Sequence, residues 1–201
     1  MAVWFTADTH FGHANIIRYC NRPFASAEAM DEALIAAINE RVRPEDTLYH
    51  LGDFAFRSHR GLDAIAVAAS YRARIRCRTV HLILGNHDPQ DEEGRPPPAF
   101  AALFASARSL ARIRLPIAGM RRPVILCHYA MRVWDASHHG AWHLYGHSHG
   151  TLPDDPHARS CDVGVDAQGY APVGVEALAA IMDRKTFVAI DSHRERSGEE
   201  A

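Results

Sequence analysis

Short apolar runs that stop abruptly at polar residues recur along the whole chain. The run from Val3 to Ala7 is typical, because its residues favour β-structure and it ends at Asp8. Residues 111–117 instead alternate apolar side chains with arginine and proline, which indicates a strand with one solvated face. These patterns predict strands over residues 3–7, 47–51, 79–84, 111–117, 124–127, 142–145 and 160–165.

Helical periodicity appears between the predicted strands. Apolar side chains recur every fourth residue from Met30 to Val42, after Ser26, which suits a helix N-terminus, and before Pro44, which ends the helix. Helices alternate with strands in the first half of the chain, and strands dominate the second half. We therefore expect an α/β fold, a layered β-sandwich flanked by helices. The other predicted helices cover residues 62–70, 99–107 and 173–182, and residues 12–23 and 89–98 are predicted loops.

Length and composition place the chain among ordinary globular proteins. Its 201 residues are 47% hydrophobic and 23% charged, which excludes wholesale disorder. No linker or repeat divides it, so we expect a single domain over residues 1–192 and a polar, frayed tail over residues 193–201. The absence of a long apolar run or a signal peptide, and four scattered cysteines without a CxxC pair, predict a cytoplasmic protein without a membrane span.

The fourteen histidines are the most informative feature of the composition. Many of them belong to polar clusters that begin where a predicted strand stops, and ligand crevices form at strand ends in α/β sheets. Alternate residues of an extended segment point the same way, as in His147-x-His149, so such pairs favour metal binding. The clusters are Asp8-x-His10, Gly52-Asp53, Gly85-Asn86-His87-Asp88, Cys127-His128 and Gly146-His147-Ser148-His149.

Taken in this order, the clusters resemble the motif set of the calcineurin-like metallophosphoesterase superfamily. The opening Asp8-Thr9-His10-Phe11-Gly12-His13 is similar to its small prokaryotic branch. The chain departs from the broader family after Asp53, where Phe54-Ala55-Phe56 stands in place of a further acid. The resemblance implies two divalent metal ions on the sandwich. It implies Asp8, His10, Asp53 and His149 as ligands of one ion and Asp53, Asn86, His128 and His147 as ligands of the other, with Asp53 bridging.

These implied ligands determine the chemistry that we expect. Carboxylate, imidazole and carboxamide ligands together suit Mn, Fe, Co, Ni or Zn, among which we favour Mn. Two such ions about 3.5–4 Å apart clamp a phosphoryl group and acidify a bridging water, which attacks as hydroxide. His87 lies beside a ligand position and is the candidate general acid, and Asp88 is the candidate for orienting its ring. His13 and Arg22 are candidates for contact with the substrate phosphate.

The predicted function is therefore a metal-dependent phosphatase or phosphodiesterase acting on a small phosphoester. One alternative is a non-catalytic metal-binding scaffold of the same fold, although every ligand position and His87 are filled. The other is a nuclease, which the formal net charge of −2 disfavours. The alternating arginines from Arg72 to Arg78 would support the nuclease alternative if they formed a basic stripe along a strand. A solvated sheet edge explains them better. We expect His50 and His81 to pack within the sheet.

Overall fold

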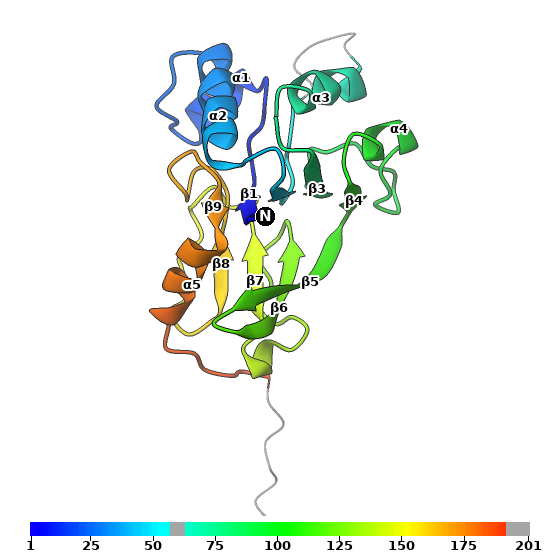
Figure 1. Ribbon diagram of the computed structural model, residues 1–201. Helices are drawn as coiled ribbons and strands as arrows, with labels where there is room; N and C mark the ends of the chain where they lie inside the picture. The colour runs from blue at the N-terminus through cyan, green and yellow to red at the C-terminus, as the bar shows by residue number, and fades with distance from the viewer. Residues whose placement is uncertain (57–62, 192–201) are drawn as a thin grey trace, which may run out of the picture.

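The computed structural model describes residues 1–56 and 63–191, which form two β-sheets with helices outside them (Figure 1). The first sheet has the strand order β4-β3-β2-β1-β9, in which β1 to β4 are parallel and β9 runs antiparallel to β1. Its parallel strands all end at the same edge. The strands are β1 (Val3–Thr6), β2 (Thr47–His50), β3 (Thr79–Ile83), β4 (Ser106–Arg108) and β9 (Val173–Gly174).

The second sheet has the strand order β5-β6-β7-β8. The hairpin of β5 and β6 turns at Ala118 and Gly119, both of which have positive φ. Strands β6, β7 and β8 are parallel to one another, so their carboxyl ends also share one edge. The strands are β5 (Leu110–Ile117), β6 (Met120–Cys127), β7 (Trp142–Tyr145) and β8 (Ser160–Asp162).

Helices cover the first sheet on the side away from the second sheet, and a last helix lies along one flank (Figure 1). In α2 the side chain of Ser26 accepts a hydrogen bond from the amide of Ala29, and Met30, Leu34 and Ile38 form the buried face, as predicted. The helices are α1 (Ala14–Tyr19), α2 (Ala27–Arg41), α3 (Ala64–Arg72), α4 (Pro98–Ala101) and α5 (Val175–Asp183), with a 3-10 turn at Ser137–His139.

The core has two main layers, which confirm the predicted layered sandwich flanked by helices. One layer packs α2 and α4 against the first sheet. The other fills the space between the sheets, where Phe5 and Leu51 share a cluster with Leu126 and Trp142. The carboxyl ends of the parallel strands of both sheets meet at one edge of the sandwich, where His128 after β6 is hydrogen-bonded to the carbonyl of Leu51 after β2. No helix of the described ranges is long and apolar enough to cross a membrane.

Some predicted elements are wrong in extent or type. The predicted helix over 99–107 ends at Ala101, and Ser106–Arg108 instead pairs with β3 as an edge strand. Helix propensity is weak, and the unpaired edge of a parallel strand outweighs it. The predicted helix over 173–182 begins at Val175, after the short strand β9. Helix α1 was missed within the predicted loop over 12–23. Leu62 and residues 193–201 lie outside the described residues.

The alternating arginines do not form the predicted strand edge. Arg72 ends α3, and its guanidinium donates hydrogen bonds to the carbonyls of Ile75, Cys77 and Arg78, which closes the turn after the helix. Arg74 pairs with Glu32 on α2. Arg72 and Arg74 thus bind the local backbone and a neighbouring helix, and residues 73–78 lie between α3 and β3 and not on a strand.

His50 is expected to make stability depend on pH. The ring is fully buried and bonded to the Thr9 hydroxyl at 2.9 Å, and burial lowers its pKa from 6.5 to about 3. The His50 ring therefore binds a proton in the unfolded chain below about pH 6.5 but stays neutral in the folded protein. The free energy of unfolding thus decreases as the pH falls below that value. Between pH 7 and pH 5 this loss is about 2 kcal/mol.

Urea unfolding of metal-free protein at both pH values measures this loss. His50→Gln should flatten the pH dependence by that amount, whereas the half-buried strand histidine His81, replaced by Gln, serves as the control and should flatten it less. Equal pH dependence in wild type and His50→Gln would contradict the assignment.

Candidate metal centre

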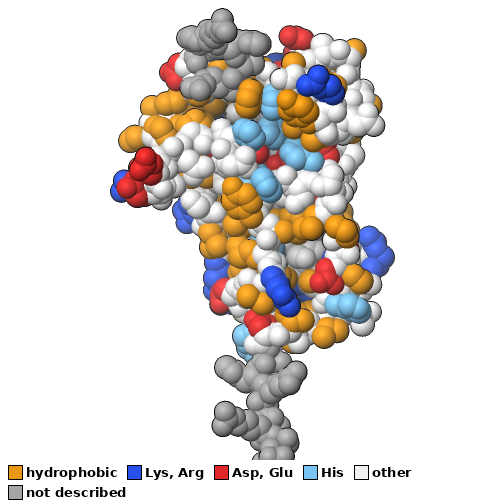
Figure 2. Space-filling model, turned by 180° about the vertical axis from the view of Figure 1, so that it is seen from behind, with side chains coloured by type: hydrophobic (Ala, Val, Ile, Leu, Met, Phe, Trp, Pro, Cys, Tyr) orange, Lys and Arg blue, Asp and Glu red, His pale blue; other side chains and the backbone are white. Residues whose placement is uncertain are grey.

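The predicted polar clusters come together at the edge where the parallel strands of both sheets end. Asp8 and His10 follow β1, Asp53 follows β2, and Asn86 follows β3 from the first sheet. From the second sheet, His128 follows β6, and the His147-x-His149 pair follows β7. Figure 2 shows histidine side chains gathered on one face, with acidic atoms between them. The strand-end rule therefore predicted correctly that these side chains lie close together.

The backbone at this centre is strained. Non-glycine residues in the left-handed region cost on the order of 1–2 kcal/mol, and they persist where the surrounding structure enforces them. These left-handed residues follow β1, β2 and β7, at the points where the polar clusters begin. The residues concerned are Asp8 (φ 58°), His10 (48°), Asp53 (56°), His147 (67°) and His149 (48°).

Glycines beside these turns permit the close packing. A Cβ on Gly85 would lie 2.2 Å from Oδ1 of Asp53, and one on Gly146 would lie 2.7 Å from Oδ2 of Asp8. Any larger residue would therefore displace one of the two buried carboxylates. The Gly-Asn-His and Gly-His-Ser-His clusters need their first residue for this reason.

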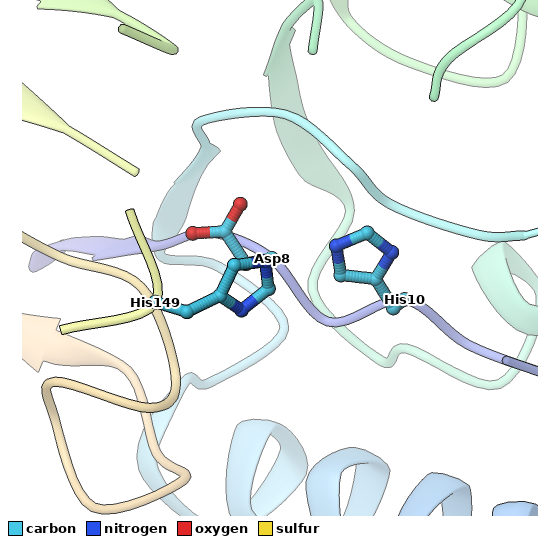
Figure 3. A group of neighbouring side chains, drawn as sticks. All are labelled: Asp8, His10 and His149. Atoms are coloured by element: carbon cyan, nitrogen blue, oxygen red, sulfur yellow. The ribbon is translucent and has the colours of Figure 1, made fainter. Parts of the chain in front are cut away.

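One group of metal-binding atoms comes from Asp8, His10 and His149, whose ligand atoms lie within 4.8 Å of one another (Figure 3). The rings of His10 and His149 are stacked, with centroids 5.1 Å apart. Asp8 is fully buried, and both its oxygens accept hydrogen bonds from the amide of His147. Burial and the neighbouring Asp53 raise the pKa of Asp8. The surrounding protein therefore does not fully stabilise the charged form of this carboxylate.

A second group consists of Asp53, His128 and His147, again within 4.8 Å. Nδ1 of His128 donates a hydrogen bond to the carbonyl of Leu51 at 2.7 Å, which leaves a lone pair on Nε2. That Nε2 lies 3.2 Å from Oδ1 of Asn86 and 3.5 Å from Oδ2 of Asp53. Three acceptor atoms thus face one another without a proton to share, an arrangement that a cation satisfies.

Asp53 lies between the two groups. Its Oδ2 is 3.4 Å from Nε2 of His10 and 3.5 Å from Nε2 of His128, one histidine from each group. Its Oδ1 accepts a hydrogen bond from the amide of His87 at 2.9 Å. Nε2 of His10 is buried and has no hydrogen-bond partner among the residues that the structure describes. Burial and the nearby His149 lower the pKa of His10, so this nitrogen is unprotonated and fits a metal ion.

Asp88 does not orient the His87 ring in this structure. Its buried carboxylate accepts hydrogen bonds from the amides of Gly85, Asp53 and Phe54, at 2.8 to 3.0 Å. It therefore ties the turn after β3 to the turn after β2. Burial raises its pKa to about 7. The His87 side chain is exposed, and its ring lies 5.2 Å from that of His10.

Arg22 is held by other residues of the protein. It is buried, its guanidinium forms two hydrogen bonds with the Asp166 carboxylate, and it donates to the carbonyls of Asp8 and Thr9. These partners engage the guanidinium, so the structure adds no support for its substrate contact, which stays a prediction. Its role is to fix the left-handed turn after β1.

His13 lies beside the first group. Its ring stacks on Phe56 at 3.7 Å, and its Nδ1 lies 3.4 Å from Nδ1 of His10. Burial, followed by the effect of His87, lowers its pKa to about 4. His13 is therefore neutral at pH 7, and its substrate contact stays a prediction.

Asp166 is a residue of the centre that the sequence analysis missed. Its Oδ2 accepts a hydrogen bond from Nδ1 of His149 at 2.6 Å, which leaves the lone pair of that ring on Nε2. Asp166 directly follows the predicted strand 160–165, so the strand-end rule could have found it. Cys20 lies within 4.8 Å of both residues, but burial raises the pKa of its thiol to about 11, which keeps it protonated and a poor ligand.

Comparison with known proteins identifies the family. Residues 1–165 match the family model described as calcineurin-like phosphoesterase, which covers most of the chain. The chain therefore belongs to the calcineurin-like phosphoesterase family, as the resemblance of its motifs indicated.

The relatives are small proteins from a prokaryote and a phage. The chain is 28% identical over 191 residues to the uncharacterized protein MJ1445 of Methanocaldococcus jannaschii, covering 92% of this chain and 94% of the relative. It is 30% identical over 183 residues to the gene 66 protein of Mycobacterium phage D29, covering 82% and 88%. A crystal structure of the protein of unknown function AQ665 from Aquifex aeolicus shares the fold, with a TM-score of 0.63, 19% identity, and coverage of 90% and 98%.

Asp166→Asn should weaken metal binding at the first group. The change keeps the shape of the side chain but removes the charge that holds His149 with its lone pair on Nε2, and such partners typically contribute 10- to 100-fold in metal affinity. Titration of metal-free protein with Mn²⁺ against a competing chelator measures this loss. The control is Asp183→Asn, which removes an exposed carboxylate away from the centre. Unchanged affinity for both ions in Asp166→Asn would contradict the role of Asp166.

Proposed function

We propose that this protein is a metal-dependent phosphoesterase that uses two divalent ions to hydrolyse phosphomonoesters or phosphodiesters. The observation that carries the proposal is the position of Asp53, whose Oδ2 faces a histidine of each metal-binding group at 3.4 and 3.5 Å. One carboxylate oxygen placed between two ligand groups is suited to bridge two ions. Membership of the calcineurin-like phosphoesterase family supports the same reaction class.

The proposed ligands fit first-row transition metals. They are oxygen and imidazole donors without a thiolate, so a closed structural zinc site is disfavoured and Mn, Fe, Co, Ni or Zn remain, with Mn favoured. When bound, the two metal ions would act as Lewis acids toward the phosphoryl oxygens and toward water. One ion would be held by Asp8, His10, Asp53 and His149, and the other by Asp53, Asn86, His128 and His147.

The chain's own contribution is rigidity and neutral histidines. The amides of Asp53 and Phe54 donate to the carboxylate of Asp88, and His128 donates to Leu51, so the second group is oriented before any ion arrives. Burial lowers the pKa values of His10 and His128 and keeps both rings neutral, which is the state that binds metal. Little reorganisation is therefore needed when the ions bind.

His87 is proposed as the general acid. Its amide donates a hydrogen bond to Oδ1 of Asp53, which places the residue at the edge of the proposed two-metal site. Its exposed ring lies beside His10 and Phe56. From this position the imidazolium can give a proton to the oxygen of the leaving group. Asp88 serves this step only indirectly, by holding the turn on which His87 lies.

His87→Ala should separate proton donation from metal binding. Loss of a general acid typically lowers the rate about 10²–10⁴-fold, but only for leaving groups that need the proton. The variant should therefore be severely slowed on alkyl esters and much less on p-nitrophenyl esters, with Mn²⁺ content unchanged. The measurements are kcat on both ester types with and without Mn²⁺, together with metal analysis.

His139→Ala, which removes another exposed histidine, is the matched control and should behave as wild type. Equal losses on both ester types would contradict the acid role. Absence of any Mn²⁺-dependent turnover in the wild type would reject the phosphoesterase itself and favour the scaffold.

A further inference from the structure

A cavity of about 380 Å³ lies on the outer face of the second sheet, away from the first sheet. Trp134 and Tyr145 form part of its lining, and their neighbour His143 lies on the same face of β7. Three segments make the walls: the loop after His128, the loop after His149 and residues 187–191. Two of these segments are direct continuations of the chain from proposed metal ligands. The volume falls within the usual range for small-molecule sites.

The cavity shares two lining residues with the depression at the metal centre. Leu152 and Pro153 line it, and they also border the shallow depression that contains His147 and His149. On the other side, Tyr129 packs edge-on against the rings of His128 and His147, with centroids 5.1 and 4.7 Å away. The residues directly after Tyr129 line the cavity. A molecule bound at the metal centre can therefore extend over Leu152 and Pro153 into the cavity.

Exposed apolar side chains gather around this cavity. Leu152, Val188 and Ile190 are 45%, 50% and 61% exposed, and all three line it. Tyr129, at the passage from the metal centre, is 47% exposed. Large apolar side chains concentrated around one hollow mark a place that binds an apolar group. Figure 2 shows apolar side chains on the same face as the histidines, directly below them.

The charged groups at the rim do not favour a charged occupant. Asp191 accepts a hydrogen bond from Ser137 and pairs with His138, and Asp155 accepts one from the amide of His157. Both carboxylates are therefore engaged by the protein. Arg132 adds one charge of the opposite sign. The cavity thus offers apolar contact area more than polar recognition.

We propose that this cavity binds an apolar alkyl or aryl group of the phosphoester substrate while the phosphate lies at the metal centre. The inference rests on the proposed phosphoesterase function and names the substrate class that the site prefers: esters with an apolar organic part. Selectivity arises from burial of that part against Leu152, Val188 and Ile190.

A homologous series of alkyl p-nitrophenyl phosphodiesters tests the proposal, because the leaving group stays constant while the alkyl chain grows from methyl to hexyl. Burying a methylene contributes up to about 0.8 kcal/mol, so kcat/KM of the Mn²⁺-loaded enzyme should rise about two- to fourfold per methylene. The readout is the hexyl-to-methyl ratio of kcat/KM, measured below the concentration at which the esters form micelles.

Ile190→Ser and Val188→Ser should reduce that ratio at least threefold each. Their matched controls, Met120→Ser and Leu110→Ser, remove side chains that are equally exposed, at 61% and 50%, on the β5–β6 hairpin, and they should keep the wild-type ratio. A ratio near one in the wild type, with the methyl ester hydrolysed, would overturn the inference and leave the phosphoesterase intact. No turnover of these diesters would overturn the inference, and no turnover of p-nitrophenyl phosphate as well would overturn the proposed function.

Sedimentation of the same variants distinguishes another occupant. A dimer of the wild type that Ile190→Ser dissociates would show that a second copy covers the cavity, which overturns the substrate assignment. A wild type and variant that sediment alike, together with the loss of chain-length selectivity, support it.

Discussion

Two buried carboxylates of like charge, Asp8 and Asp53, impose the constraint on which this structure depends. They are 0% and 2% exposed, and Asp53 contributes to the raised pKa of Asp8. The protein offers them little compensating charge, because His10 is held neutral and Arg22 is bound to Asp166. Divalent cations bound between the two carboxylates would replace the repulsion between them by attraction of both to the cations. The described residues around the two carboxylates thus form candidate groups for metal binding and supply little positive charge of their own.

The surrounding residues hold this unfavourable arrangement in place. The Asp88 carboxylate ties together the turns after β2 and β3, and the guanidinium of Arg22 fixes the turn after β1. Asp8 and Asp53 have left-handed backbone conformations, and these contacts are made at the same two turns. The hydrogen bonds thus stabilise the strained backbone where the strain occurs. Glycine at position 85 leaves room for the Asp53 carboxylate and for nothing larger. The rigidity that brings the ligands together is thus a property of the turns and of the residues that bind them.

The sequence predicted the location of the centre better than the direction of its side chains. Polar residues after buried strands converge because parallel strands share an edge, and this rule places Asp8, Asp53 and His128 together. It cannot tell whether a side chain faces outward or binds a neighbouring backbone, as the guanidinium of Arg22 does. Residues 106 and 107 were predicted as helix, because edge pairing with β3 is a tertiary effect that the sequence pattern does not show. The cavity was not predicted, since three separate loops form it.

Crystals grown with Mn²⁺ and measured at the manganese absorption edge test the central claim most directly. The account predicts two anomalous peaks about 3.5–4 Å apart. One should lie among Asp8, His10 and His149, the other among Asn86, His128 and His147, with Asp53 between them and touching both. A single peak, or two peaks of which only one contacts Asp53, would contradict the account.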